Sequence, residues 1–254
     1  MVLGKLFGRG KPKEISYEQS KDLANAKSTK VRAKLAANPS AKPEVLYYLT
    51  EDKSAEVRQV VAKNENTPYQ ANNILARDED DEVRSELARK ICRLLPSVSG
   101  DEADQIREQT IETLELLAED QLPSIRVILA EALKESLTAP KHIILKLAQD
   151  AEDIVASPVL EYSPLLSEVD LLEIIASGVA TGSLPAIARR DNLAEEVSDA
   201  VAATLDIPAV SALLANKSAR VREETLDQLI SQAEGIEVLH EPLVMRVDLS
   251  IRAM

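Results

Sequence analysis

Few residues in this sequence could carry catalysis or bind a metal. The chain contains two histidines, His142 and His240, and a single cysteine, Cys92. Zinc and iron sites need several such ligands close together, and the two histidines fall in separate predicted helices. Cys92 stands in an apolar stretch with no evident base beside it, which is typical of a buried small hydrophobe. No phosphate-binding loop, nucleophile elbow or dinucleotide fingerprint occurs. We therefore predict no catalytic residue, no cofactor and no metal site.

An acidic run at positions 78–82 could suggest a cation site. The run lacks the glycine and the spaced ligands of an EF-hand loop. Negative charge is favourable in the first turn of a helix, where unpaired backbone N–H groups carry a partial positive charge. We interpret the run as a turn between helices followed by the first turn of the second one.

Arginines and aspartates recur at regular positions along the chain. The arginines are at positions 32, 58, 84, 126 and 222, and the aspartates are at positions 52, 78 and 120. One interpretation makes the arginines a stripe that binds an anionic partner. The other pairs each arginine with an aspartate of a neighbouring repeat, as a ladder. Each arginine directly follows an apolar valine or isoleucine, and this regular position favours the ladder.

The candidate partner-binding residues combine these arginines with two adjacent tyrosines. Tyr47 and Tyr48 lie about 100° apart on a predicted helix, so at least one of them is expected to reach the surface. Tyrosine is enriched at binding hot spots, although an ordinary amphipathic position is the simpler interpretation. The full candidate set is Tyr47, Tyr48, Arg32, Arg58 and Arg84.

A repeat positions all of these residues. A Val-Arg pair recurs at Val31, Val57 and Val83, a spacing of 26 residues each time, with weaker copies at Ile125 and Val221 and degenerate copies expected at Ile154 and Val197. Helix-capping residues precede the pairs, namely Ser28, Ser54, Asp80 and Ser218. Further along the chain, Ser167 and Asp170 have the spacing of a capping box before a helix. Asn38 and Asn64 are expected to close the first helices in the left-handed conformation. Prolines then open the second helices, at positions 43, 68, 140 and 208.

A unit of about 26 residues with two short helices cannot bury its apolar face alone, so neighbouring units stack. The composition agrees with an all-helical protein: 45% of residues are apolar, only 2% are aromatic, and the chain has seven glycines. The predicted fold is an all-α solenoid, or superhelix, of helix-turn-helix repeats. Its parts are a basic flexible tail (1–13), N-terminal repeats (14–96) and degenerate repeats that continue the array (97–254), with a joint at 97–100. Residues 239–250 look like the start of another unit, so we expect a longer natural chain or a second surface covering that end.

The net charge and the composition limit the classes of protein to which this chain can belong. The formal net charge is −13, which argues against a large phosphate-binding surface. One cysteine excludes an intrachain disulfide, and no apolar run of 18 residues or secretory signal is apparent, so we expect a cytoplasmic protein. Residues 1–13 carry four basic residues and no acid, together with apolar side chains that include the only phenylalanine. That tail is either an ordinary flexible terminus or a short anchor on anionic lipid.

Two resemblances follow from these motifs. The run at 31–39, with the segment 43–46 and Asp52 after it, resembles HEAT-like and variant leucine-rich repeats. The blocks at 163–176, 186–193, 197–200 and 214–216 resemble a bacterial domain family of unknown function, and the likeness extends over about residues 28–250. The resemblance implies helical repeats and a bacterial source. It implies no activity and no catalytic residue.

The function we expect is a non-catalytic scaffold or adaptor that binds a partner protein along the repeat surface. The negative charge predicts a partner with basic segments. A membrane-associated scaffold, attached through residues 1–13, is the alternative. A nucleic-acid-processing enzyme on HEAT-like repeats is disfavoured, because such enzymes need a basic surface and aromatic side chains, and this chain has no tryptophan.

Overall fold

The computed structural model describes residues 15–95, 103–178 and 182–246. Sixteen helices and no strand are found in these residues, which confirms the all-α prediction. The chain divides into two compact units, Met1–Leu129 and Ala130–Met254, and the division falls inside helix α9 (Pro123–Leu133). The basic tail at 1–13 and the expected joint at 97–100 lie outside the described residues.

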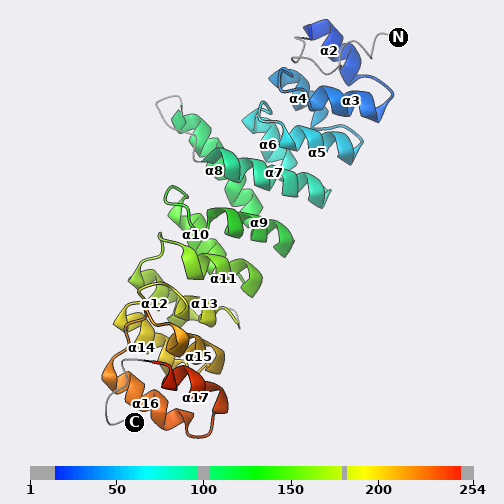
Figure 1. Ribbon diagram of the computed structural model, residues 1–254. Helices are drawn as coiled ribbons and strands as arrows, with labels where there is room; N and C mark the ends of the chain where they lie inside the picture. Colours follow the sequence, from blue (N-terminus) through cyan, green and yellow to red (C-terminus); the bar gives the residue numbers. More distant parts are fainter. Residues whose placement is uncertain (1–14, 96–102, 179–181, 247–254) are drawn as a thin grey trace. The chain divides into compact units, whose positions relative to one another are not determined.

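The N-terminal unit is built from helices in two neighbouring rows. One row contains α3 (Thr29–Ala36), α5 (Ala55–Lys63) and α7 (Asp81–Leu94), each packed on the next. The other contains α2 (Tyr17–Ala24), α4 (Pro43–Leu49), α6 (Tyr69–Leu75) and α8 (Ala103–Ala118), again in consecutive contact (Figure 1). Val57 and Val61 of α5 are fully buried, so the apolar face follows the i, i+4 spacing in the sequence.

The C-terminal unit repeats this arrangement. Helices α11 (Asp153–Tyr162), α13 (Leu184–Ala188), α15 (Ile207–Ala215) and α17 (Glu237–Val244) contact one another in order. Helices α12 (Glu168–Ser177), α14 (Glu195–Ala203) and α16 (Glu223–Ala233) form the second row, and α10 (Lys141–Ala148) packs on α11 (Figure 1). Aliphatic side chains such as Leu160, Val197 and Leu213 fill the interior.

Several predicted helix starts are confirmed. The Asp80 carboxylate accepts a hydrogen bond from the backbone N–H of Val83 at 3.1 Å, as an N-cap should. Ser167 and Asp170 form a capping box at the start of α12. Ser28 and Ser54 occupy the N-cap positions of α3 and α5, but their side chains make no capping hydrogen bond. The acidic run therefore is a turn followed by a first helical turn.

Other details of the predicted repeat are wrong. Helix α16 begins at Glu223 after Arg222, so Ser218 does not cap it. Ile154 is 58% exposed while the next residue, Val155, is buried, so the degenerate copy is displaced by one position. Asn64 ends α5 with φ −73° rather than in the left-handed region. Among the described non-glycine residues, positive φ angles occur at Asn192 and Leu205. The role of Asn64 lies instead in the hydrogen bonds that its side chain makes to the carbonyls of Ala36 and Asn38.

Membrane-spanning segments were predicted to be absent. No helix in the described part of the chain has both the length and the apolar character that crossing a bilayer requires.

Candidate functional site

The recurring arginines and aspartates form a ladder between successive hairpins. Arg58 of α5 holds the Asp78 carboxylate through two parallel bonds, Nε to Oδ2 at 2.7 Å and Nη2 to Oδ1 at 2.8 Å. Arg32 holds Asp52 in the same way at 2.5 and 2.9 Å, and Arg84 holds Asp120 at 2.6 and 3.3 Å. For Arg32, Arg58 and Arg84, the favoured interpretation of the sequence, a ladder of ion pairs between neighbouring repeats, is confirmed, whereas Arg222 pairs with Glu195, Glu196 and Asp199.

Each rung of the ladder has two further bonds that fix its geometry. The arginine Nη1 donates to the backbone carbonyl six residues earlier, at Ala26, Asp52, Asp78 and, for Arg126, Asp120. The aspartate Oδ1 accepts the backbone N–H two residues later; for Asp52 the donor is Ser54, at 2.9 Å. Each guanidinium therefore joins the turn before its own helix to the later turn that contains the aspartate.

The electrostatics of the first rung favour the charged forms of both partners. Burial alone would raise the pKa of Asp52, but the hydrogen bonds from Arg32 and from the Ser54 backbone outweigh it, so the pKa of Asp52 lies below its ordinary value. The bonds to their aspartates raise the pKa values of Arg32 and Arg58.

The ladder leaves little of the candidate arginines for a partner. The side chains of Arg32, Arg58 and Arg84 are 5%, 10% and 13% exposed, and their guanidinium groups are already bonded. The structure therefore places these three candidate binding residues inside the N-terminal unit, where they join its hairpins.

A second ladder, which the sequence reasoning missed, links the ends of successive helices. The Asn64 Nδ2 donates to the carbonyls of Ala36 and Asn38 at 2.7 and 3.0 Å. Asn216 repeats this in the C-terminal unit, donating to Ala188 and Arg190 at 2.8 Å each. These carbonyls lie at or just after the end of the previous helix in the same row, where the backbone carbonyls have no partner within the helix. A signal was present in the sequence: asparagine with a polar residue two positions later, at 38, 64 and 216, which makes a local Asx turn.

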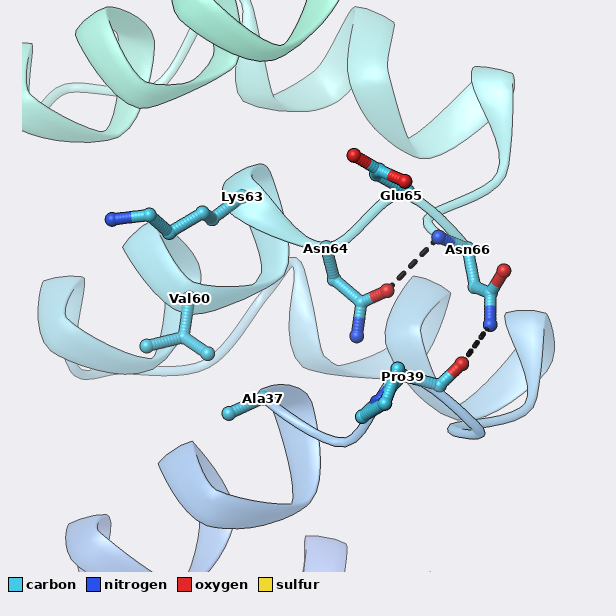
Figure 2. A pocket seen from close by; sticks show the side chains of 7 residues that line it. All are labelled: Ala37, Pro39, Val60, Lys63, Asn64, Glu65 and Asn66. Carbon is cyan, nitrogen blue, oxygen red and sulfur yellow. Dashed lines mark hydrogen bonds between the residues drawn. The ribbon is translucent and has the colours of Figure 1, made fainter. Parts of the chain in front are cut away.

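The hollow nearest to this ladder does not resemble an active site. Figure 2 shows Asn64 beside Asn66, whose side chain reaches the Pro39 carbonyl. The hollow has a volume of about 330 Å³, and its other lining residues are Ala37, Val60, Lys63 and Glu65. Its asparagines are occupied with backbone bonds, so they position no reacting group.

The two histidines and the cysteine, which the sequence predicts to form no metal or catalytic site, lie on three different helices. His142 lies on α10 and His240 on α17, both at the surface, and the His240 Nε2 is 2.8 Å from the carbonyl of Ala233. Cys92 is 9% exposed, and burial raises the pKa of its thiol to about 12, as expected of a packing residue. In the ranges that the structure describes, no group of three or more potential metal ligands comes together.

The two candidate tyrosines both reach the surface. Tyr47 is 46% exposed and Tyr48 is 58% exposed. The Tyr48 hydroxyl donates to Asn25 Oδ1 at 3.1 Å, which ties α4 to the turn after α2. Tyr48 also lines a shallow groove with Tyr17 and Val45. Their role in partner binding stays a prediction.

A row of acidic helices occurs in the C-terminal unit. Helices α12, α14 and α16 lie side by side and contain nine carboxylates and no lysine or arginine. Arg222, the N-cap of α16, pairs with Glu196 of α14 at 2.7 Å and also contacts Asp199. Five carboxylates of the row form no ion pair with any residue that the structure describes; they are Glu168, Glu173, Glu223, Glu224 and Asp227.

One family comparison bears on this unit. A model of an uncharacterised protein family conserved in bacteria (DUF2336) matches residues 155–254. The match includes the whole acidic row and begins inside α11. It confirms the resemblance to a bacterial domain family, over a shorter stretch than the sequence motifs suggested. The comparison with curated proteins gives no match.

Proposed function

We propose that this protein is a non-catalytic scaffold that binds a partner protein through a basic segment of that partner. The surface for this segment is the exposed side of α12, α14 and α16, called the acidic face below. The observation that carries the proposal is the set of five unpaired carboxylates on α12 and α16, which lie on either side of α14 in a row of helices that contain no lysine or arginine. Complementary charge of this kind accelerates encounter and rejects acidic partners.

The ladders support a rigid form of binding. Charged and amide side chains that could have contacted a ligand are bonded between hairpins instead, as for Arg58 and Asn216. A surface already held in place loses little conformational entropy when a partner docks. For the whole chain, we propose that the stacked hairpins form a right-handed, HEAT-like α-solenoid and that the protein works in the bacterial cytoplasm. Small-angle X-ray scattering is expected to give a radius of gyration above about 18 Å, the value for a compact chain of this length.

A binding experiment on the full chain tests the acidic face. The probe is a fluorescent lysine- and arginine-rich peptide, and the readout is anisotropy at low and at physiological salt. The test variant neutralises the five unpaired carboxylates: Glu168→Gln, Glu173→Gln, Glu223→Gln, Glu224→Gln and Asp227→Asn. The matched control neutralises five exposed acids of the N-terminal unit: Glu44→Gln, Glu51→Gln, Glu56→Gln, Asp81→Asn and Glu82→Gln.

Both variants change the net charge equally, so they separate a local surface from overall charge. The proposal predicts that the test variant loses at least tenfold in affinity while the control stays close to the native chain, with binding that weakens as salt rises. Equal losses in the two variants would show attraction to overall charge only and would overturn the proposal. Retention of affinity by the test variant would overturn it as well.

A further inference from the structure

Lys90 occupies a position where the matching hairpins use a neutral amide. It lies 26 residues after Asn64, and Asn64 lies 26 residues after Asn38. Like the Asn64 side chain, the Lys90 side chain reaches back to the end of the previous helix in the same row, which is α5. There its Nζ donates to the Asn64 carbonyl at 3.3 Å. A rung of the second ladder is thus made by an amine. The side chain is 1% exposed, which is exceptional for lysine.

The hydrogen-bond partners around Lys90 match an amine better than an ammonium. Nζ has two acceptors, the Asn64 carbonyl and the Asn72 Oδ1 at 2.8 Å. A neutral amine carries two N–H groups and one lone pair, whereas an ammonium carries three N–H groups and a full positive charge. Protonation therefore adds a buried N–H for which the described residues provide no acceptor. An unsatisfied buried donor weakens the folded state.

The charged surroundings do not compensate for a positive charge at this position. No carboxylate of the described residues lies within 4.0 Å of Nζ. The charges that act on it are Arg93, one turn later on α7, and Glu65, on the turn after α5. These two pair with each other at 3.3 Å in solvent. Helix α6 contributes the uncharged Asn72, and the side chains that α8 buries are uncharged, namely Thr110, Thr113, Leu114, Leu117 and Ala118.

We propose that Lys90 joins the α5–α6 and α7–α8 hairpins as a neutral amine, and that its protonation loosens this joint, which makes it a pH-sensitive device within the N-terminal unit. Burial lowers the pKa of Lys90 from 10.5 to about 7, in agreement with the hydrogen-bond geometry. Since the folded-state pKa is below that of the unfolded chain, unfolding takes up a proton between these two values. Stability is then lowest at pH below 7 and increases as pH rises above it.

Urea unfolding of the full chain, followed by circular dichroism across this pH range, tests the proposal. For one proton taken up on unfolding, the unfolding constant of the native chain falls by up to about tenfold per pH unit above pH 7. Lys90→Met keeps the volume and removes the titrating group, so most of this slope is lost. The matched control, Lys30→Met, changes an exposed lysine of α3 and keeps the slope. A native slope in Lys90→Met would overturn the proposal.

A second measurement on the native chain does not depend on whether the variant folds. Nuclear magnetic resonance of ¹³C- and ¹⁵N-labelled lysine reports the titration of Nζ directly. A midpoint near pH 7 for Lys90 supports the pH-sensitive joint. A midpoint near the ordinary pKa of 10.5 overturns it. Neither measurement involves a partner, so its outcome is independent of the proposed function.

Discussion

Cutting one rung of the arginine–aspartate ladder is expected to destabilise the N-terminal unit strongly. In Asp78→Asn the shape of the side chain is kept, but Arg58 loses the buried carboxylate that it holds at 2.7 and 2.8 Å. Removing one member of a buried ion pair costs about 3–5 kcal/mol. Arg58 keeps its bond to the Asp52 carbonyl at 2.8 Å and a longer one to Glu79, so we expect the lower end, about 3 kcal/mol.

A double-mutant cycle measures this rung by urea unfolding at neutral pH. The variants are Arg58→Met, Asp78→Asn and the two together. Because the second substitution removes a charge that the first has already left without a partner, the double variant is expected to recover about 2 kcal/mol relative to the sum. The control, Arg93→Met, breaks the exposed pair with Glu65 and is expected to cost less than about 1 kcal/mol. If Asp78→Asn costs no more than this control, the argument that burial strengthens the rung is refuted.

Three further predictions concern other groups. The pKa of Asp52 is lowered in the folded chain, so its stabilisation is present above its ordinary pKa of about 4 and is lost as pH falls through the folded value; Asp52→Asn should flatten the acid unfolding curve, and an unchanged curve would contradict this. Asn216→Ala removes two half-buried hydrogen bonds and should cost about 1–3 kcal/mol in a thermal melt, whereas the exposed Lys217→Ala should be close to neutral. The Cys92 thiol should react with iodoacetamide many times more slowly in the native chain than in urea, and equal rates would show that it is accessible.

The repeat allowed much of the helical architecture to be predicted, because its signals are local. A capping residue, a valine face and a proline each act within one or two turns of a helix, as Asp80, Val57 and Pro43 do. The arginine–aspartate ladder was also predictable at its first three rungs, since an arginine follows the valine of each repeat and an aspartate comes shortly before the next repeat. Where the repeat weakens, the same reasoning misplaced the start of α16 and the buried residue of α11. There the packing of neighbouring helices overrides the local pattern.

The order of residues by itself determined the helices, their apolar faces and the scarcity of groups able to do chemistry. Only the tertiary structure decided how deeply the polar side chains are buried and what they bond beyond the arginine–aspartate pairs. It buried Arg58 between two hairpins, turned Asn64 toward the helix end before it, and enclosed Lys90 where a neutral amide stands in the matching hairpin. It also placed the carboxylates of three separate helices on adjacent elements. The reason is physical: hydrogen bonding and desolvation depend on neighbours that are distant in the chain, and a local pattern does not contain those neighbours.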